Sequence, residues 1–146
     1  KTTYPSYQEE KEVLRKHFLQ ESLLPIISKK ELSHTKEIVK SIYIDEKVVD
    51  YILKIVFATR FPSKYNMAEL EQVIEYGAST RASLSIHKAC RALAFIKNRN
   101  FVIPDDVKDI VPSVLRHRII LSHEAESDNV TSEKVVEQIL NKIPSP

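Results

Sequence analysis

Apolar side chains recur at three- and four-residue intervals along most of this chain, which is the pattern of helices with one buried face. The clearest set follows Asp45, a residue type that favours the start of a helix, and ends before Pro62. Its inward positions are Val48, Tyr51, Ile52, Ile55, Val56 and Thr59. Similar sets predict helices after Ser6, from Ser28 to about Ser41, from Pro104 to about Leu115, and from Thr131 to about Ile143. The sequence therefore predicts an all-α fold, a small bundle of four to five main helices.

Residues 77–100 form the longest of these patterns. Gly77 ends the preceding element, and Ser79 or Thr80 can cap the new helix with a hydroxyl group. The residues expected to face inward are Ala82, Ile86, Ala89, Leu93 and Ile96. Several further alanines would let other helices approach closely, so we expect this helix near the centre of the fold.

The remaining segments are less regular. Residues 63–76 are expected to be a connection with one short helical turn, and residues 124–129 a polar loop. Phe101–Ile103 and residues 119–122 are short apolar stretches that can pair as a very small two-stranded sheet. Pro112 is expected to kink or shorten the helix that contains it.

Composition argues against a self-contained active site. Loops that cradle phosphate need several glycines, and the chain has one glycine in 146 residues and no phosphate-loop motif. No serine or cysteine has a base at catalytic spacing. The five histidines form no zinc motif, and Glu31-x-x-His34 is half of a di-iron motif without its second copy. We therefore expect no catalytic residue and no metal site within this chain.

Cysteine content and hydropathy bear on the compartment. Cys90 is the single cysteine, which excludes an internal disulfide and suits a reducing cytoplasm. It lies on the apolar side of its helix, which favours a packed thiol over a nucleophile. The sequence shows no signal peptide and no run of 18 apolar residues, so we expect a cytoplasmic protein without a membrane span.

Charge is unevenly distributed in the long helical segment. Between Gly77 and Pro104 there are five cations and no acid. Arg81, Lys88 and Arg91 project to one side, and Arg81 lies in the first turn, where the helix dipole disfavours a cation. The residues alone favour solvated charges beside an apolar stripe. The alternatives are a bound phosphate, shared with the helix N-terminus, and a nucleic-acid face, which the abundant acids elsewhere disfavour.

Five stretches, taken in order, resemble the C-terminal lid of MoxR-family AAA+ ATPases. Residues 77–83 read GASTRAS, residues 101–107 read FVIPDDV, and residues 114–121 read VLRHRIIL. The stretch from Tyr51 to Arg60 and the ending from Val136 to Pro144 are similar to the family as well. The resemblance covers residues 22–146. It implies a linker or helix over residues 1–21 that follows from an ATPase core, and a lid domain over residues 22–146.

The resemblance also implies a function. Arg81 takes the place of the sensor-2 arginine, which would reach the terminal phosphates of ATP, with Ser79 and Thr80 near the same phosphates. ATP and Mg²⁺ would be held mainly by the P-loop core of a longer protein, so this chain alone is expected to be inactive. Implied partners are that core, neighbouring subunits of a ring, and client proteins, some with a von Willebrand A domain. The alternative is a free-standing helical module that binds protein or nucleic acid.

Overall fold

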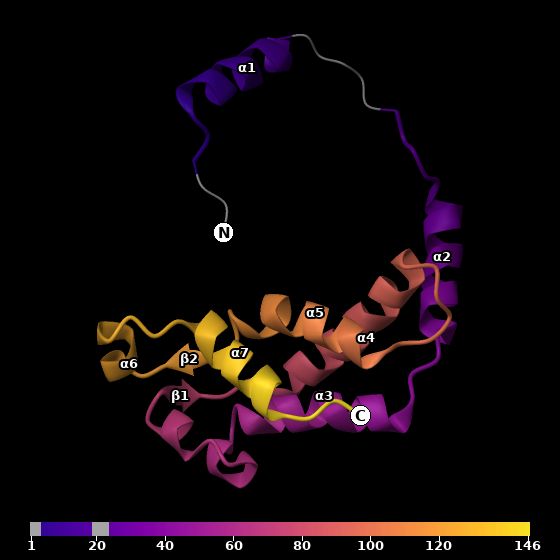
Figure 1. Ribbon diagram of the computed structural model, residues 1–146. Helices are drawn as coiled ribbons and strands as arrows, with labels where there is room; N and C mark the ends of the chain where they lie inside the picture. The colour runs from indigo at the N-terminus through magenta and orange to yellow at the C-terminus, as the bar shows by residue number, and fades with distance from the viewer. Residues whose placement is uncertain (1–3, 19–23) are drawn as a thin grey trace. The chain divides into compact units, whose positions relative to one another are not determined.

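The computed structural model describes residues 4–18 and 24–146, which fall into two units, Lys1–Ser33 and His34–Pro146 (Figure 1). The first unit holds α1 (Tyr7–Phe18), and α2 (Lys29–Ser41) begins in the first unit and ends in the second. The second unit continues with α3 (Glu46–Ala58), the 3₁₀ turns η1 (Pro62–Tyr65) and η2 (Ala68–Glu71), β1 (Ile74–Tyr76), α4 (Thr80–Ile96), α5 (Pro104–Leu115), β2 (Ile120–Leu121), α6 (His123–Ser127) and α7 (Ser132–Lys142). The predicted helical fold with a very small sheet is confirmed, and the described residues form seven α-helices rather than four or five.

Reciprocal capping boxes begin both α1 and α2. The N–H of Ser6 donates to Glu9 at 2.7 Å, and the N–H of Ser28 donates to Glu31 at 2.8 Å. In each box the glutamate N–H donates back to the serine hydroxyl. These bonds stabilise the carboxylates and lower the pKa of both glutamates. The predicted starts of both helices are confirmed.

The apolar faces of these two helices are largely exposed, although Ile42, predicted to lie on the inner face of the second helix, is buried just beyond its end. Val13 and Leu14 of α1 are exposed, and Leu19, predicted on the same face, lies outside the described residues. Along α2 no residue is buried, and Leu32 and Ile38 are exposed. The apolar residues of α2 alternate closely with lysine and glutamate, so the apolar stripe is narrow. Periodicity identified the helix, but it does not ensure that another element covers its apolar face.

The core of the second unit lies among α3, α4, α5 and α7 (Figure 1). All six inward residues predicted for α3 are buried, and Asp45 caps this helix by accepting from the N–H of Lys47 at 2.9 Å. On α4 the fully buried positions are Ala82, Ile86, Cys90 and Ala94. Their strict four-residue spacing leaves Ile96 on another side of the last turn, 72% exposed, so its predicted burial is wrong.

One of the two strands of the small sheet differs from the prediction. β1 pairs antiparallel with β2, with the buried residues Ile74 and Leu121 opposite each other. Phe101 instead forms an isolated parallel bridge with Tyr43. β1 was not predicted because it is three residues long and Ile74 is its one buried position. The predicted short extended segment at residues 119–122 does contain β2.

The C-terminal part contains one further correction. Residues 124–129, predicted as a polar loop, lie mostly within α6 and its end, because Ser122 caps that helix and Ala125 is buried. α5 is not interrupted at Pro112 and reaches Leu115 as predicted. Thr131 caps α7 as predicted, by accepting from the N–H of Lys134 at 3.3 Å. Val135, Val136 and Ile139 of α7 are buried.

α4 ends at an asparagine in the left-handed backbone region. Asn98 has φ 56°, and its N–H donates to Phe95 O while Arg99 N–H donates to Ala94 O. This is the bond pattern of a Schellman motif, in which asparagine substitutes for the usual glycine. The turn delivers Arg99 to the start of α5.

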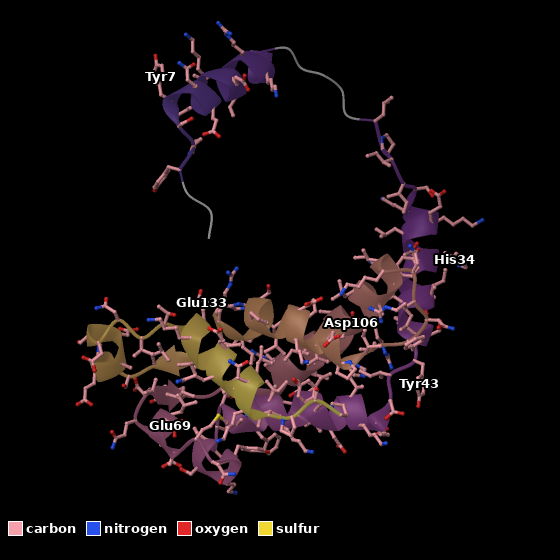
Figure 2. The ribbon with its side chains drawn as sticks, viewed as in Figure 1. Tyr7, His34, Tyr43, Glu69, Asp106 and Glu133 are labelled. Carbon is pink, nitrogen blue, oxygen red and sulfur yellow. The ribbon has the colours of Figure 1, made fainter. Side chains whose placement is uncertain are left out.

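A buried ion pair joins the end of α4 to α5. The Asp106 side chain, labelled in Figure 2, is fully buried and accepts from both terminal nitrogens of Arg99, at 2.8 and 2.5 Å. It also accepts from the N–H of Ile103 at 3.1 Å, which completes the start of α5. Lys97 approaches the same carboxylate at 3.3 Å. The role of Asp106 therefore extends beyond capping the start of α5.

Cys90 is predicted to be chemically inert in the folded protein. Burial raises the pKa of its thiol to about 12, with a further contribution from Asp106 and Asp109. Against an ordinary thiol pKa near 8.5, this lowers the thiolate population at pH 8 by roughly a thousandfold. We expect Ellman's reagent at pH 8 to label the native chain only at the rate of transient opening, and to label the guanidinium-unfolded chain within seconds to minutes. Rapid, full labelling of the native chain would contradict the buried position of Cys90.

Candidate functional site

Three consecutive predicted site residues, Ser79, Thr80 and Arg81, lie exposed at the start of α4. Ser79 occupies the N-cap position with extended backbone, φ −78° and ψ 171°. Its hydroxyl makes no capping hydrogen bond, which corrects the capping role predicted for it, and Thr80 is already the first helical residue. The first turn closes through the N–H of Ala82, which donates to Ser79 O at 2.8 Å. The Ser79 hydroxyl therefore accepts no hydrogen bond from the backbone N–H groups of the first turn of α4.

Arg81 is the exposed cation of this first turn. Within residues 4–18 and 24–146 it takes part in no ion pair. The segment from Gly77 to Pro104 contains no acid that can neutralise it locally. An unpaired guanidinium beside the positive end of a helix dipole is a favourable environment for an anion.

The backbone before Arg81 is held by the end of α3. The Thr59 hydroxyl accepts from the N–H of Ala78 at 2.9 Å and donates to Val56 O at 2.7 Å. The Arg60 Nε donates to Ala78 O at 2.6 Å. Gly77 lies so close that a Cβ built on it would be 2.3 Å from Thr59 O. We call these four residues, Thr59, Arg60, Gly77 and Ala78, the α3–α4 latch.

An apolar groove of about 270 Å³ runs beside this helix start, between α3 and α4. Its lining residues are Val49, Ile52, Leu53, Thr80, Ser83, Leu84 and His87. Burial, and then the positive charge of Arg91, lower the pKa of His87, so this imidazole is neutral at neutral pH. The groove extends the site from Thr80 along α4 with a largely uncharged surface.

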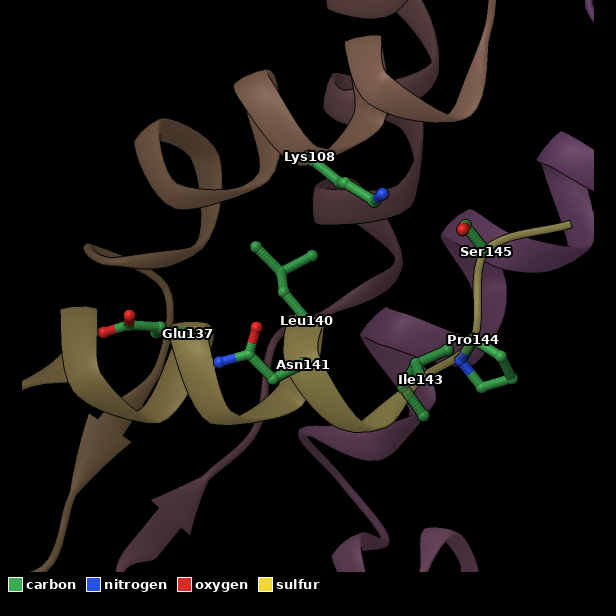
Figure 3. A pocket seen from close by; sticks show the side chains of 7 residues that line it. All are labelled: Lys108, Glu137, Leu140, Asn141, Ile143, Pro144 and Ser145. Atoms are coloured by element: carbon green, nitrogen blue, oxygen red, sulfur yellow. The ribbon is translucent and has the colours of Figure 1, made fainter.

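A second, more polar pocket of about 480 Å³ lies between α5, α7 and the C-terminal segment (Figure 3). Lys108, Glu137, Asn141 and Ser145 contribute its polar side chains. None of the predicted site residues lines it. No cluster of three metal-ligating side chains is found among the residues that the structure describes. The start of α4 is therefore the candidate site.

Two other arginines, Arg91 of α4 and Arg118 of the family-like residues 114–121, bond to backbone elsewhere in the fold. Arg91 is half-buried and donates to Lys40 O at 3.3 Å. Arg118 donates to Val114 O at 3.2 Å, at the end of α5. Thr59 and Arg60 are the residues whose role in the site the sequence did not reveal. Both residues lie in the stretch that resembles the family, so the sequence did mark this region. Their hydrogen bonds to Ala78 could not be predicted, because bonds to a backbone 18 or 19 residues away leave no local sequence pattern.

Known proteins resemble this chain over most of its length. Residues 68–139 match the AAA lid domain family. The chain is 37% identical over 144 residues to the chaperone MoxR1 of Mycobacterium tuberculosis and 33% identical over 147 residues to the uncharacterised protein YeaC of Bacillus subtilis. Each alignment covers 98% of this chain, and 38% and 43% of the relative.

A solved structure shares the fold. The crystal structure of a candidate ATPase from Cytophaga hutchinsonii superposes with a TM-score of 0.86 at 34% identity. The match covers 99% of this chain and 45% of that protein. The chain thus spans about two fifths of the length of the relatives it matches. No helix in the described part of the chain is long and apolar enough to cross a membrane.

Proposed function

Because this chain belongs to the MoxR family of AAA+ ATPases, as its lid domain, we propose that Arg81 acts as the sensor-2 residue of a longer ATPase. In this role the guanidinium contacts the terminal phosphates of ATP bound, with Mg²⁺, in an adjacent P-loop core. Ser79 and Thr80 place the helix N-terminus near the same phosphates. The observation that supports the proposal is an exposed Arg81 without an ion pair in the described chain, beside an N-terminus that Ser79 does not cap.

The residues fit a phosphate chemically. Arginine offers a planar set of donors that matches two phosphate oxygens, and the first turn of α4 adds backbone N–H groups. A charge-assisted hydrogen bond of this kind contributes about 1.5–3 kcal/mol. Because that energy is available only while the terminal phosphate is present, it favours a closed arrangement of lid and core before hydrolysis. Loss of the contact after hydrolysis lets the lid move.

The proposal extends to the work done by the whole protein. The Mycobacterium tuberculosis relative is called a chaperone. We propose that lid movement here likewise drives remodelling or maturation of partner proteins, including ones with a von Willebrand A domain. Neighbouring subunits of a ring would be further partners, since a lid that moves relative to its core can transmit that motion to the next subunit.

Arg81→Ala is the direct test, in the protein with its nucleotide-binding core attached. We expect ATP turnover to fall by about 10- to 100-fold, which corresponds to a loss of about 1.5–3 kcal/mol. Lys88→Ala is the matched control, because Lys88 is an exposed cation two turns further along α4. That control should stay within about twofold of the parent protein.

Unchanged turnover in Arg81→Ala would refute the sensor-2 role. A binding module for nucleic acid would then be tested by the salt dependence of DNA binding. Affinity that falls steeply between 50 and 200 mM salt, to an extent of about 10³-fold or more, would identify the basic side of α4 as a phosphate-binding surface.

A further inference from the structure

We propose that Thr59 and Arg60 are positioning residues for Arg81, because together they fix the backbone from which the sensor-2 helix starts. The inference rests on the proposed function of Arg81. It assigns to the end of α3 a role in nucleotide response, although neither Thr59 nor Arg60 is expected to touch the nucleotide.

The Thr59 hydroxyl both donates and accepts a hydrogen bond. The side chain is buried, and its oxygen both donates to Val56 O at 2.7 Å and accepts from the N–H of Ala78 at 2.9 Å. Because Ala78 is itself fully buried, water cannot replace this acceptor for its N–H. The hydroxyl therefore connects the last turn of α3 to the residue three positions before Arg81.

Arg60 holds the other polar group of the same peptide segment. Its Nε donates to Ala78 O at 2.6 Å, and its guanidinium lies over the Phe57 ring at 5.0 Å from the ring centroid. This cation–π contact adds a second interaction that holds the Arg60 side chain at the end of α3. Both the N–H and the carbonyl of Ala78 are thus bonded to consecutive side chains of one helix end.

The contact at Gly77 removes the remaining freedom. Atoms of Thr59 and Arg60 lie 2.3–2.9 Å from the place where a Gly77 Cβ would be, so the two backbones touch. Gly77 is in steric contact with the end of α3, and the N–H and carbonyl of Ala78 are both hydrogen-bonded to it. The start of α4 therefore moves together with the end of α3. A force that phosphate exerts on Arg81 is consequently transmitted to α3, including the exposed Phe57.

The test compares two replacements of Thr59 in the protein with its core attached. Thr59→Val keeps the shape and removes the hydroxyl, whereas Thr59→Ser keeps the hydroxyl. We expect Thr59→Val to lower kcat/KM for ATP by about three- to tenfold, because the buried N–H of Ala78 loses its acceptor. Thr59→Ser should keep kcat/KM within about twofold of the parent protein.

A double-mutant cycle with Arg81→Ala separates positioning from general destabilisation. If Thr59 acts through Arg81, Thr59→Val lowers kcat/KM no further once Arg81 is alanine. An equal fold loss in both backgrounds would overturn the positioning role while leaving the sensor-2 role intact. If Arg81→Ala alone has no effect, the sensor-2 proposal fails, and the positioning role fails with it. Arg60→Lys, which keeps the charge but lacks Nε–H, gives the same cycle should Thr59→Val not fold.

Discussion

Asp106→Asn is expected to destabilise the fold by about 3 kcal/mol, the lower end of the range for breaking a buried ion pair. The amide cannot serve as an ionic partner for Arg99, whose side chain is 21% exposed and so keeps only partial access to water. The substitution also weakens the bond from the N–H of Ile103 that orders the start of α5. Because α4 and α5 pack extensively, loosening this junction affects the centre of the second unit.

The Asp106 carboxylate also makes the free energy of unfolding depend on pH in the acidic range. Burial alone would raise the pKa of Asp106, but hydrogen bonds from Arg99, Ile103 and Lys97 outweigh it and hold the pKa below its ordinary value of 3.8. The unfolded chain therefore binds this proton more readily than the folded chain. The stabilisation is fully present above pH 3.8 and is lost as pH falls through the lower folded-state pKa.

Urea unfolding at neutral pH and at about pH 3 measures both effects. Asp105→Asn is the matched control, because the neighbouring carboxylate is 72% exposed and, within the described residues, pairs only with Lys108 one turn away. We expect that control to lie within about 0.5 kcal/mol of the parent protein. If Asp106→Asn is as stable as Asp105→Asn at neutral pH, the buried pair contributes nothing to stability.

Local patterns predicted the elements whose signals lie within a few residues. The capping boxes at Ser6 and Ser28 and the caps at Asp45 and Thr131 were recognisable because cap and helix are adjacent in sequence. The buried face of α3 was predicted completely, since a four-turn stripe of large apolar residues has one orientation that hides it. α6 was missed because five residues hold too few apolar positions to show a period.

Features that depend on distant segments were not predictable in this way. Nothing in residues 74–76 indicates that residues 120–121 are their partner, so the predicted sheet paired the wrong strand. The candidate site residues Ser79, Thr80 and Arg81 were predicted through a family resemblance, whereas the residues alone favoured ordinary surface charges. The support beneath them, from Thr59 and Arg60, became visible only when α3 and α4 were placed side by side.

Gly77→Ala is expected to destabilise the protein by about 3 kcal/mol, at the upper end for inserting one carbon into a packed region. The reason is steric and not conformational, because Gly77 does not have a positive φ. The added Cβ would lie 2.3 Å from Thr59 O and 2.9 Å from the Arg60 Cα. These are backbone atoms at a helix end, so no side-chain rotation can relieve the overlap.

Relief of that overlap requires the start of α4 to move away from α3, which breaks the two hydrogen bonds to Ala78. Urea unfolding measures the loss of stability, and amide hydrogen exchange at Ala78 reports whether the latch itself has opened. Ser79→Ala is the control, since that side chain is exposed and makes no capping bond, and it should change stability by less than about 0.5 kcal/mol. Slow exchange at Ala78 and parent-like stability in Gly77→Ala would mean that the ends of α3 and α4 can move apart far enough to admit the Cβ without losing free energy of folding. The close approach would then be incidental to how Arg81 is held.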